Sequence, residues 1–242
     1  MLLMTEHTSR DLSALYIPGA IVVAGLIVGL SLVVALKPAG GPATGGAQQA
    51  VNIKDVDLSG DPYIGNANAP VVLAYWSDYQ CPFCKAVEIG HDQIPQIEPS
   101  LPMLIKDYVE TGKLKIVFKD YPFLSEDSDT AALYGRAVWE LYPEKYWEWR
   151  EAMFEAQDEE HGGFGNEASI LELSGTISGV SAPALKAKVT EKMEAYTADI
   201  AADRAEGTSF GINGTPGFIT GKVLIPGADS PANFKKVIDD QL

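Results

Sequence analysis

Two cysteines three positions apart are the residues in this chain best suited to chemistry. Cys81 and Cys84 are the only cysteines among the 242 residues, and Pro82 and Phe83 stand between them. A thiolate attacks a disulfide, and a second thiol three residues further on can close a ring and release the attacked partner. The spacing therefore predicts a redox-active pair in which Cys81 attacks and Cys84 resolves.

The residues around the pair predict a strand before it and a helix after it. Residues 71–76 form a short run of apolar, β-branched and aromatic side chains, which is typical of a buried strand. The pattern turns helical over about 82–89. Because the amides and dipole of a helix N-terminus favour negative charge, we expect Cys81 to lose its proton easily. Pro82 suits the first helical turn, where no backbone N–H is required.

Two other uses of the cysteines fit less well. A structural disulfide between residues three apart closes a very small loop, and such cross-links stabilise least. A zinc site needs about four ligands, and the chain adds only His7, His91 and His161, none at zinc-finger spacing. We therefore expect no metal, and no cofactor other than the Cys81–Cys84 disulfide itself.

An uncharged stretch near the start of the chain predicts a membrane anchor. Residues 17–36 carry no charge, and about twenty helical residues rise roughly 30 Å, enough to cross a hydrocarbon core. We predict an N-terminal tail over 1–14, a transmembrane anchor over 15–37 and a flexible linker over 38–54. A cleaved signal peptide is the alternative, although its apolar region is usually shorter, about 7–15 residues.

Residues 55–242 are predicted to form one acidic domain. The first fifty residues contain two basic and two acidic side chains, so the whole net charge of −15 belongs to the rest of the chain. Such a charge argues against nucleic acid and against an anionic membrane surface as partners. We therefore expect contact with the membrane only through the N-terminal helix.

The predicted order of elements within the domain is βα, β, a helical block and ββα. A second buried strand covers 114–118, and residues 125–210 read as mostly helical. Within that block, aromatic side chains gather at Trp139, Tyr142, Tyr146, Trp147 and Trp149. We interpret them as core material, with a peptide-binding surface as the alternative. Two short strands over 211–220 and 222–225 and a C-terminal helix complete the order.

Two distant motifs together resemble a known family. The chain reads Val-Val-Leu-Ala-Tyr-Trp-Ser-Asp-Tyr-Gln-Cys-Pro-Phe-Cys and, after the helical block, Gly-Thr-Pro-Gly-Phe before a hairpin. Over about residues 55–242 this resembles the membrane-anchored DsbA-like thiol–disulfide oxidoreductases. The resemblance implies an α/β thioredoxin fold with a helical insertion at about 125–210, preceded by one transmembrane helix. It also implies that Pro216 is cis beside the cysteines and that Thr215 presents its backbone to an extended substrate.

The chain departs from that family at two positions. Relatives often carry a buried acidic residue six positions before the first cysteine, where it can take the proton of the resolving thiol, but this chain has Tyr75. Tyrosine titrates near 10, so we expect the role to be vacant or to pass to water, Asp78 or Asp120. Strong oxidants of the family tend to carry histidine between the cysteines, whereas Phe83 cannot stabilise a thiolate by charge.

The resemblance implies an enzyme that oxidises thiol-containing exported proteins and works with a membrane redox partner. That partner is quinone-linked if it recharges an oxidase and electron-donating if the pair is kept reduced. Free dithiols are kept reduced in the cytosol, so we expect a cytoplasmic N-terminus and a catalytic domain outside the cell membrane. Two alternatives stay open. The pair could be kept reduced as a reductase or isomerase, or the domain could be a tethered peptide-binding module with a structural disulfide.

Overall fold

A computed structural model of the protein describes residues 51–158 and 162–242. The predicted tail, the membrane anchor and the linker as far as residue 50 lie outside the described residues. Within the described ranges, no helix is both long enough and apolar enough to cross a membrane.

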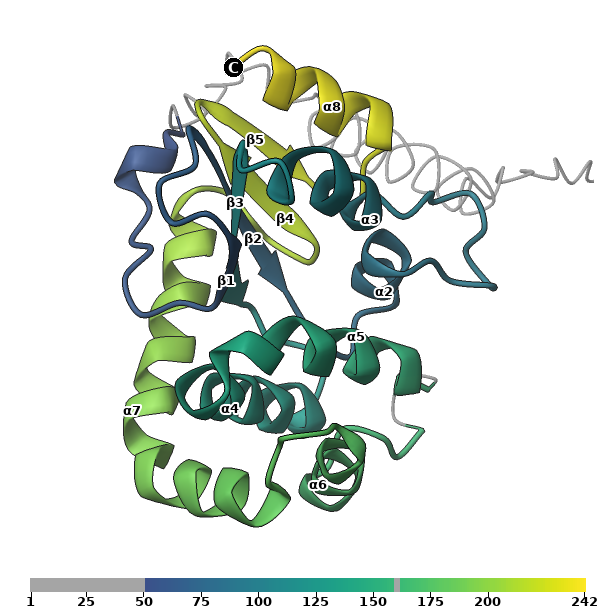
Figure 1. The fold of residues 1–242 in the computed structure, drawn as a ribbon, viewed down its shortest axis with the longest axis vertical. Coiled ribbons are helices and arrows are strands. Elements are labelled where there is room, and N and C mark those ends of the chain that lie inside the picture. The colour runs from purple at the N-terminus through teal and green to yellow at the C-terminus, as the bar shows by residue number, and fades with distance from the viewer. Residues whose placement is uncertain (1–50, 159–161) are drawn as a thin grey trace, which may run out of the picture. The chain divides into compact units, whose positions relative to one another are not determined.

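A five-stranded mixed sheet forms the centre of the domain (Figure 1). Its strand order is β1-β3-β2-β4-β5, and only the β2–β3 pair is parallel. The strands are β1 (Tyr63–Gly65), β2 (Val71–Ser77), β3 (Leu114–Asp120), β4 (Gly217–Thr220) and β5 (Val223–Pro226). This arrangement, with the helical insertion between β3 and β4, is the predicted thioredoxin fold.

Strand β2 is central and buried on both faces, which explains its continuous apolar sequence. Successive side chains point to opposite faces of a strand. Leu73 and Tyr75 accordingly join the larger core cluster, while Ala74 and Trp76 join a smaller one on the other face. The buried strand predicted over 71–76 is therefore confirmed. The redox pair follows a few residues after its end.

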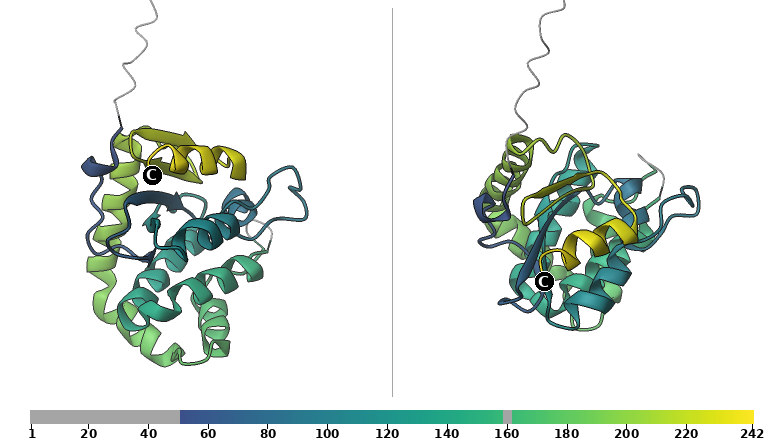
Figure 2. Two further views of the ribbon diagram at one scale, coloured as in Figure 1. Left: turned by 45° about the horizontal axis from the view of Figure 1, so that its top comes forward. Right: turned by 90° about the horizontal axis from the view of Figure 1, so that it is seen from above.

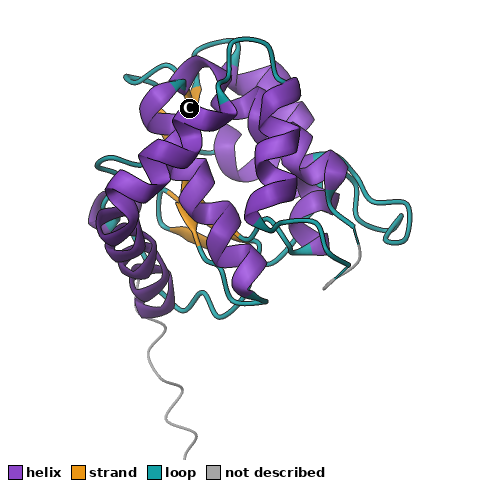
Figure 3. Cartoon of the chain, turned by 90° about the horizontal axis from the view of Figure 1, so that it is seen from below, coloured by secondary structure: helices purple, strands orange, loops and turns teal. Residues whose placement is uncertain are grey.

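Helices cover both faces of the sheet (Figures 2 and 3). On the face of the larger core lie α2 (Pro82–Glu88), α3 (Leu101–Leu104) with the π-helical turn Ile105–Val109, and α8 (Pro231–Asp239). The long helix α7 (Ala182–Ser209) covers the opposite face. There the indole N–H of Trp76 donates to the carbonyl of Asp203 at 2.9 Å, which ties the sheet to α7.

The helical insertion consists of α4 (Glu126–Leu141), a 3₁₀ turn (Pro143–Lys145), α5 (Tyr146–Ala156), α6 (Glu167–Thr176) and α7. Side chains of Ser125, Asn166 and Ser181 cap α4, α6 and α7 by accepting backbone N–H groups. Of the aromatic residues of this block, Tyr146 and Trp149 are buried members of the larger core, and Trp139, Tyr142 and Trp147 are partly buried and pack against it. Their interpretation as core material is confirmed.

Two details of the predicted element order are wrong. Strand β1 is missing from the predicted order, because it has only three residues and owes its existence to pairing with β3. A short 3₁₀ helix, Ile53–Asp55, begins within the segment predicted as linker. The strand predicted to begin at Gly211 begins only at Gly217. The N–H of Ile212 bonds to the carbonyl of Gly207 at 2.9 Å, so this segment closes the end of α7 instead of extending.

Candidate active site

The loop that carries Cys81 is held in place by Asp78. Cys81 is the N-cap residue of α2, and its N–H donates to the Asp78 carbonyl at 3.1 Å. The Asp78 carboxylate accepts the N–H groups of Gln80 at 2.9 Å and Phe123 at 3.0 Å. Burial raises the pKa of Asp78, but its oxygens are engaged by the backbone of two loops. Asp78 is thus a structural clamp in front of the redox pair.

The two thiols, both free in the structure, differ in their environments. The pKa of Cys81 is lowered, chiefly by a hydrogen bond with the Cys84 thiol and also by Thr215 and the backbone amides of Phe83 and Cys84, which together outweigh burial. Burial, followed by the neighbouring Cys81 sulfur, raises the pKa of Cys84 well above its usual value. Cys84 has no exposed surface, while Cys81 retains 3%. The environment therefore favours a thiolate at Cys81 and a thiol at Cys84.

This difference predicts the order in which the thiols react with an alkylating agent. When the reduced protein is treated with iodoacetamide near pH 6, we expect Cys81 to be labelled first, because only thiolates alkylate readily. The labelling rate of Cys81 should rise with pH through a midpoint below 9.0, the ordinary value for a thiol. Peptide mapping by mass spectrometry measures both rates. Preferential labelling of Cys84 would reverse the assigned roles.

The fold brings the second predicted motif to Cys81. The Thr215–Pro216 peptide bond is cis, the geometry implied by the family resemblance. The Cys81 thiol donates to the carbonyl oxygen of Thr215 at 3.4 Å, although the two residues are 134 positions apart. A client strand lying along Thr215 would therefore pass directly beside the Cys81 sulfur.

The two residues between the cysteines have different surroundings. Pro82 occupies the first turn of α2, as its missing N–H predicts. Phe83 is 47% exposed, the second largest exposed fraction among the large hydrophobic residues of the described ranges. An apolar ring exposed next to a reactive sulfur is available for contact with a partner protein.

The helical insertion also reaches the redox loop through Gln157, directly after α5. Its side-chain N–H₂ group donates to the Tyr79 carbonyl at 2.7 Å and to the Cys81 carbonyl at 3.2 Å. Its own backbone carbonyl accepts from the Lys85 ammonium at 3.0 Å, on the first turns of α2. Gln157 thus links the insertion to both sides of Cys81.

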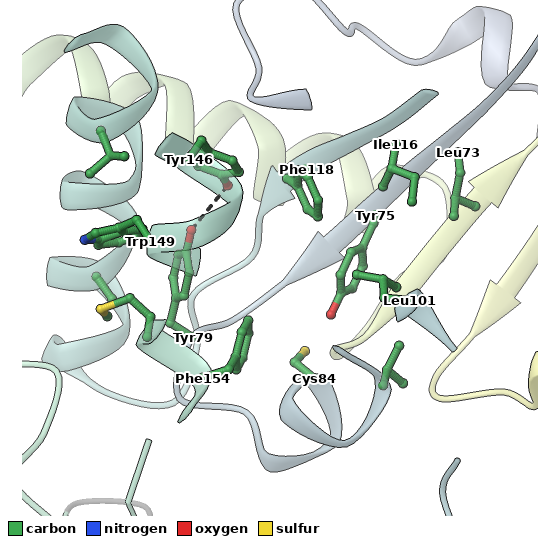
Figure 4. Packing of buried hydrophobic residues seen from close by; sticks show 14 of the residues in the cluster. Leu73, Tyr75, Tyr79, Cys84, Leu101, Ile116, Phe118, Tyr146, Trp149 and Phe154 are labelled. Atoms are coloured by element: carbon green, nitrogen blue, oxygen red, sulfur yellow. Dashed lines mark hydrogen bonds between the residues drawn. The ribbon is translucent and has the colours of Figure 1, made fainter. Parts of the chain in front are cut away.

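A buried ion pair lies behind Cys84. Glu88, one helical turn after Cys84 on α2, accepts from Arg150 of α5 through Nε at 2.9 and 3.1 Å and through Nη2 at 2.5 Å. Both side chains are essentially inaccessible. The guanidinium carbon lies 4.4–5.3 Å from the ring centres of Tyr75, Tyr79, Phe118 and Phe154 (Figure 4 shows these rings). A charged pair enclosed by aromatic rings therefore stands next to the resolving thiol.

A second buried network engages Asp120, the other acid expected to stand in as the base. Its carboxylate accepts from Arg136 Nε at 2.6 Å. Arg136 also pairs with Asp61 at 2.9 Å and with Asp203, and Lys119 pairs with the same two aspartates. This network joins β3, α4 and α7 on the side of the sheet away from Cys84. Asp120 therefore acts in holding the fold together.

Sequence reasoning missed Glu88, Arg150 and Gln157. An acid in α2 and an arginine in the segment Trp-Glu-Trp-Arg-Glu resemble solvent-facing residues, because nothing local marks them as buried. One signal was available: Glu88 follows Cys84 by four positions, so the two share a face of the helix.

Comparisons with known proteins agree with this geometry. Residues 57–240 match the model of a protein family described as Thioredoxin. The chain is 26% identical over 186 residues to disulfide bond formation protein D of Bacillus subtilis, covering 76% of this chain and 78% of that protein. The crystal structure of oxidised BdbD from B. subtilis superimposes with a TM-score of 0.66 at 23% identity, covering 76% and 94% of the two chains. The crystal structure of the thiol-disulfide exchange protein alpha-DsbA2 from Wolbachia pipientis superimposes with a TM-score of 0.63 at 28% identity. The match covers 75% of this chain and 87% of that one.

Proposed function

Because this chain belongs to the thioredoxin family, we propose that it forms disulfide bonds in exported proteins through the Cys81–Cys84 pair. It is a DsbA-like protein disulfide oxidoreductase, similar to the disulfide bond formation protein of Bacillus subtilis. The observation that carries the proposal is the asymmetry of the pair. One thiol has a lowered pKa beside the Thr215 carbonyl, and the other is buried with a raised pKa.

The reaction follows from this asymmetry. A client thiolate attacks the Cys81 sulfur of the oxidised pair, the Cys81–Cys84 bond breaks, and Cys84 leaves and takes up a proton. A second client thiolate then attacks the client sulfur of the mixed disulfide, and Cys81 leaves as the thiolate that its surroundings stabilise. The client loses two electrons and the pair gains them. The pair itself is the only redox group that this scheme requires.

The surface around Cys81 offers places to hold a client. An open groove of about 600 Å³ runs beside the start of α2 and is lined by Gln80, Pro82, Lys85, His91 and Gln157, among others. The exposed ring of Phe83 lies in the same active-site segment. An extended client segment would place its cysteine at Cys81 and pair its backbone with Thr215.

The direction of the reaction is tested by the redox state of the pair in growing cells. We expect most of the protein to hold the Cys81–Cys84 disulfide when cells are quenched with acid and free thiols are alkylated. The purified oxidised protein should in turn oxidise a peptide with two cysteines. A pair found mostly as dithiol in cells would instead support a reductase or isomerase kept reduced by a membrane donor.

We place the domain outside the cell membrane, held by residues 15–37, with a membrane redox partner that recharges the dithiol. The uncharged stretch at 17–36 and the need for an oxidising compartment support this placement. The full-length protein should then remain in the membrane fraction after carbonate washing. When protease is added to intact cells from which any outer layer has been removed, it should digest the domain. Protection of the domain from that protease would place the chemistry in the cytosol and contradict the proposal.

A further inference from the structure

The hydroxyl of Tyr75 is a buried polar group with no partner at ordinary hydrogen-bond geometry among the described residues, although Cys84 and Glu88 lie close enough to influence it. Its ring is fixed by stacking on Phe218 of β4 at 4.5 Å and by contact with Phe118 of β3 at 6.0 Å. Buried polar groups are nearly always hydrogen-bonded, so an exception calls for an explanation. Figure 4 shows the hydroxyl pointing toward the sulfur of Cys84.

Two titratable groups act on this hydroxyl from the same helix. The pKa of Tyr75 is raised well above its usual value, first by burial and then by the neighbouring Cys84 and Glu88. Cys84 and Glu88 lie one turn apart on α2 and so face β2 together. Oε2 of Glu88 accepts only one of the three Arg150 hydrogen bonds, which leaves it able to accept another. The Tyr75 hydroxyl therefore lies near both the Cys84 thiol and the Glu88 carboxylate.

The chemistry of the pair requires a proton path at this place. Cys84 must gain a proton when it leaves Cys81 and lose one when it attacks Cys81, yet no part of Cys84 is exposed. The two acids that sequence reasoning offered are engaged elsewhere, Asp78 by backbone amides and Asp120 by Arg136. Glu88 is the acid that shares a buried space with Cys84.

We propose that Tyr75 relays the proton of Cys84 to and from Glu88. When Cys84 attacks, its S–H proton passes to the Tyr75 oxygen while the Tyr75 O–H proton passes to Oε2 of Glu88. The sulfur then displaces the partner sulfur from Cys81 as a thiolate. When Cys84 leaves, the same two transfers run in reverse. The hydrogen bonds from Arg150 hold the Glu88 side chain in place.

This relay rests on the proposed disulfide exchange, and the reaction of reduced protein with excess peptide disulfide tests both. The first phase is the attack by Cys81, and its rate depends on peptide concentration. The second is the intramolecular attack by Cys84, which releases the second peptide thiol at a rate independent of concentration. Rapid acid quenching followed by mass spectrometry separates the two between pH 5 and 9.

Tyr75→Phe removes only the hydroxyl. Because that hydroxyl is buried and has no partner at ordinary hydrogen-bond geometry, the variant should unfold at a similar denaturant concentration. Proton transfer by a positioned group typically contributes about 10²–10⁴-fold, so the second phase should slow at least about tenfold at pH 7. It should also depend more steeply on pH, because hydroxide must then remove the proton. The first phase should be unchanged.

Tyr146→Phe is the matched control. The Tyr146 hydroxyl lies 3.2 Å from the Tyr79 hydroxyl and 3.4 Å from Nη1 of Arg150, and neither of these hydrogen bonds involves Cys84. We expect both phases of this variant to match the unaltered protein. If Tyr75→Phe also matches it in rate and pH profile, the relay is wrong. If the unaltered protein shows no exchange with the peptide, the proposed function fails instead.

Two variants test Glu88 as the other end of the relay. Glu88→Asp keeps a carboxylate for Arg150 but withdraws it from Tyr75, and Glu88→Gln combined with Arg150→Met removes both charges. Each should slow the second phase, and adding Tyr75→Phe should slow it little further, because the groups act in one chain. An undiminished second phase in Glu88→Asp would exclude Glu88 as the proton acceptor.

Discussion

Cys84→Ser is expected to lose all turnover and to accumulate covalent complexes between Cys81 and client proteins. The variant keeps Cys81, and a serine hydroxyl can replace the Cys84 thiol as the hydrogen-bond partner that lowers the Cys81 pKa, so Cys81 still attacks a disulfide and forms a mixed disulfide. Without Cys84 no internal thiol can displace the partner. Non-reducing electrophoresis of cell extracts should show these complexes as bands that disappear on reduction.

Cys81→Ser is the matched control for this prediction. It retains the other thiol, but Cys84 is fully buried and its pKa is raised, so we expect neither turnover nor complexes. The combined Cys81→Ser and Cys84→Ser protein should behave in the same way. Complexes formed by Cys81→Ser, or normal peptide oxidation by Cys84→Ser, would overturn the roles assigned to the two sulfurs. Normal activity with neither cysteine would favour a peptide-binding module.

The sequence was most informative where chemistry depends on neighbouring residues. The strand over 71–76 and the helix beginning at Pro82 follow from local pattern and spacing, and the structure contains both elements. Thr215 and Pro216 could be placed beside Cys81 only through resemblance to a family. Nothing local to residue 215 indicates a partner 134 positions away.

The unpredicted part of the site comes from long-range pairing of charged residues. Glu88 and Arg150 are 62 positions apart, and either alone resembles a surface residue. Burial of such groups is favourable only when both are present with good geometry, which neither helix can indicate by itself. The sequence shows Tyr75 where relatives carry an acid, but the proposed role of Tyr75 depends on Glu88, which no local pattern marks as buried.

In the proposed mechanism the helical insertion supports the redox pair as well as the core. Arg150 fixes Glu88 behind Cys84, and Gln157, seven positions later, holds the carbonyls on the other side of the redox loop. Both come from α5 or its end, so this helix supports the redox pair from two directions. Changes in α5 should therefore affect disulfide exchange even where they do not touch a client.

Arg150→Met is expected to lower the free energy of unfolding by about 3–5 kcal/mol, the usual cost of leaving one member of a buried ion pair alone. Methionine fills much of the same space within the aromatic enclosure, so the loss comes mainly from the unpaired Glu88 carboxylate. Adding Glu88→Gln removes that charge and should recover much of the stability. Denaturant unfolding of the three proteins measures these differences. Lys186→Met is the control, since its pair with Glu167 is half exposed and worth less than about 1 kcal/mol.

The loss in free energy of unfolding caused by Arg150→Met should also depend on pH. Burial already raises the pKa of Glu88 above 4.5, and removing the cation that opposes this effect raises it further. A carboxyl whose pKa is higher in the folded protein than in the unfolded chain favours folding below the unfolded value, and this contribution is lost as the pH rises through the folded value. The variant should therefore be least destabilised near pH 4.5 and increasingly so toward neutral pH. A loss of stability equal to that of Lys186→Met, or one independent of pH, would mean that Glu88 is not held as a buried carboxylate by Arg150.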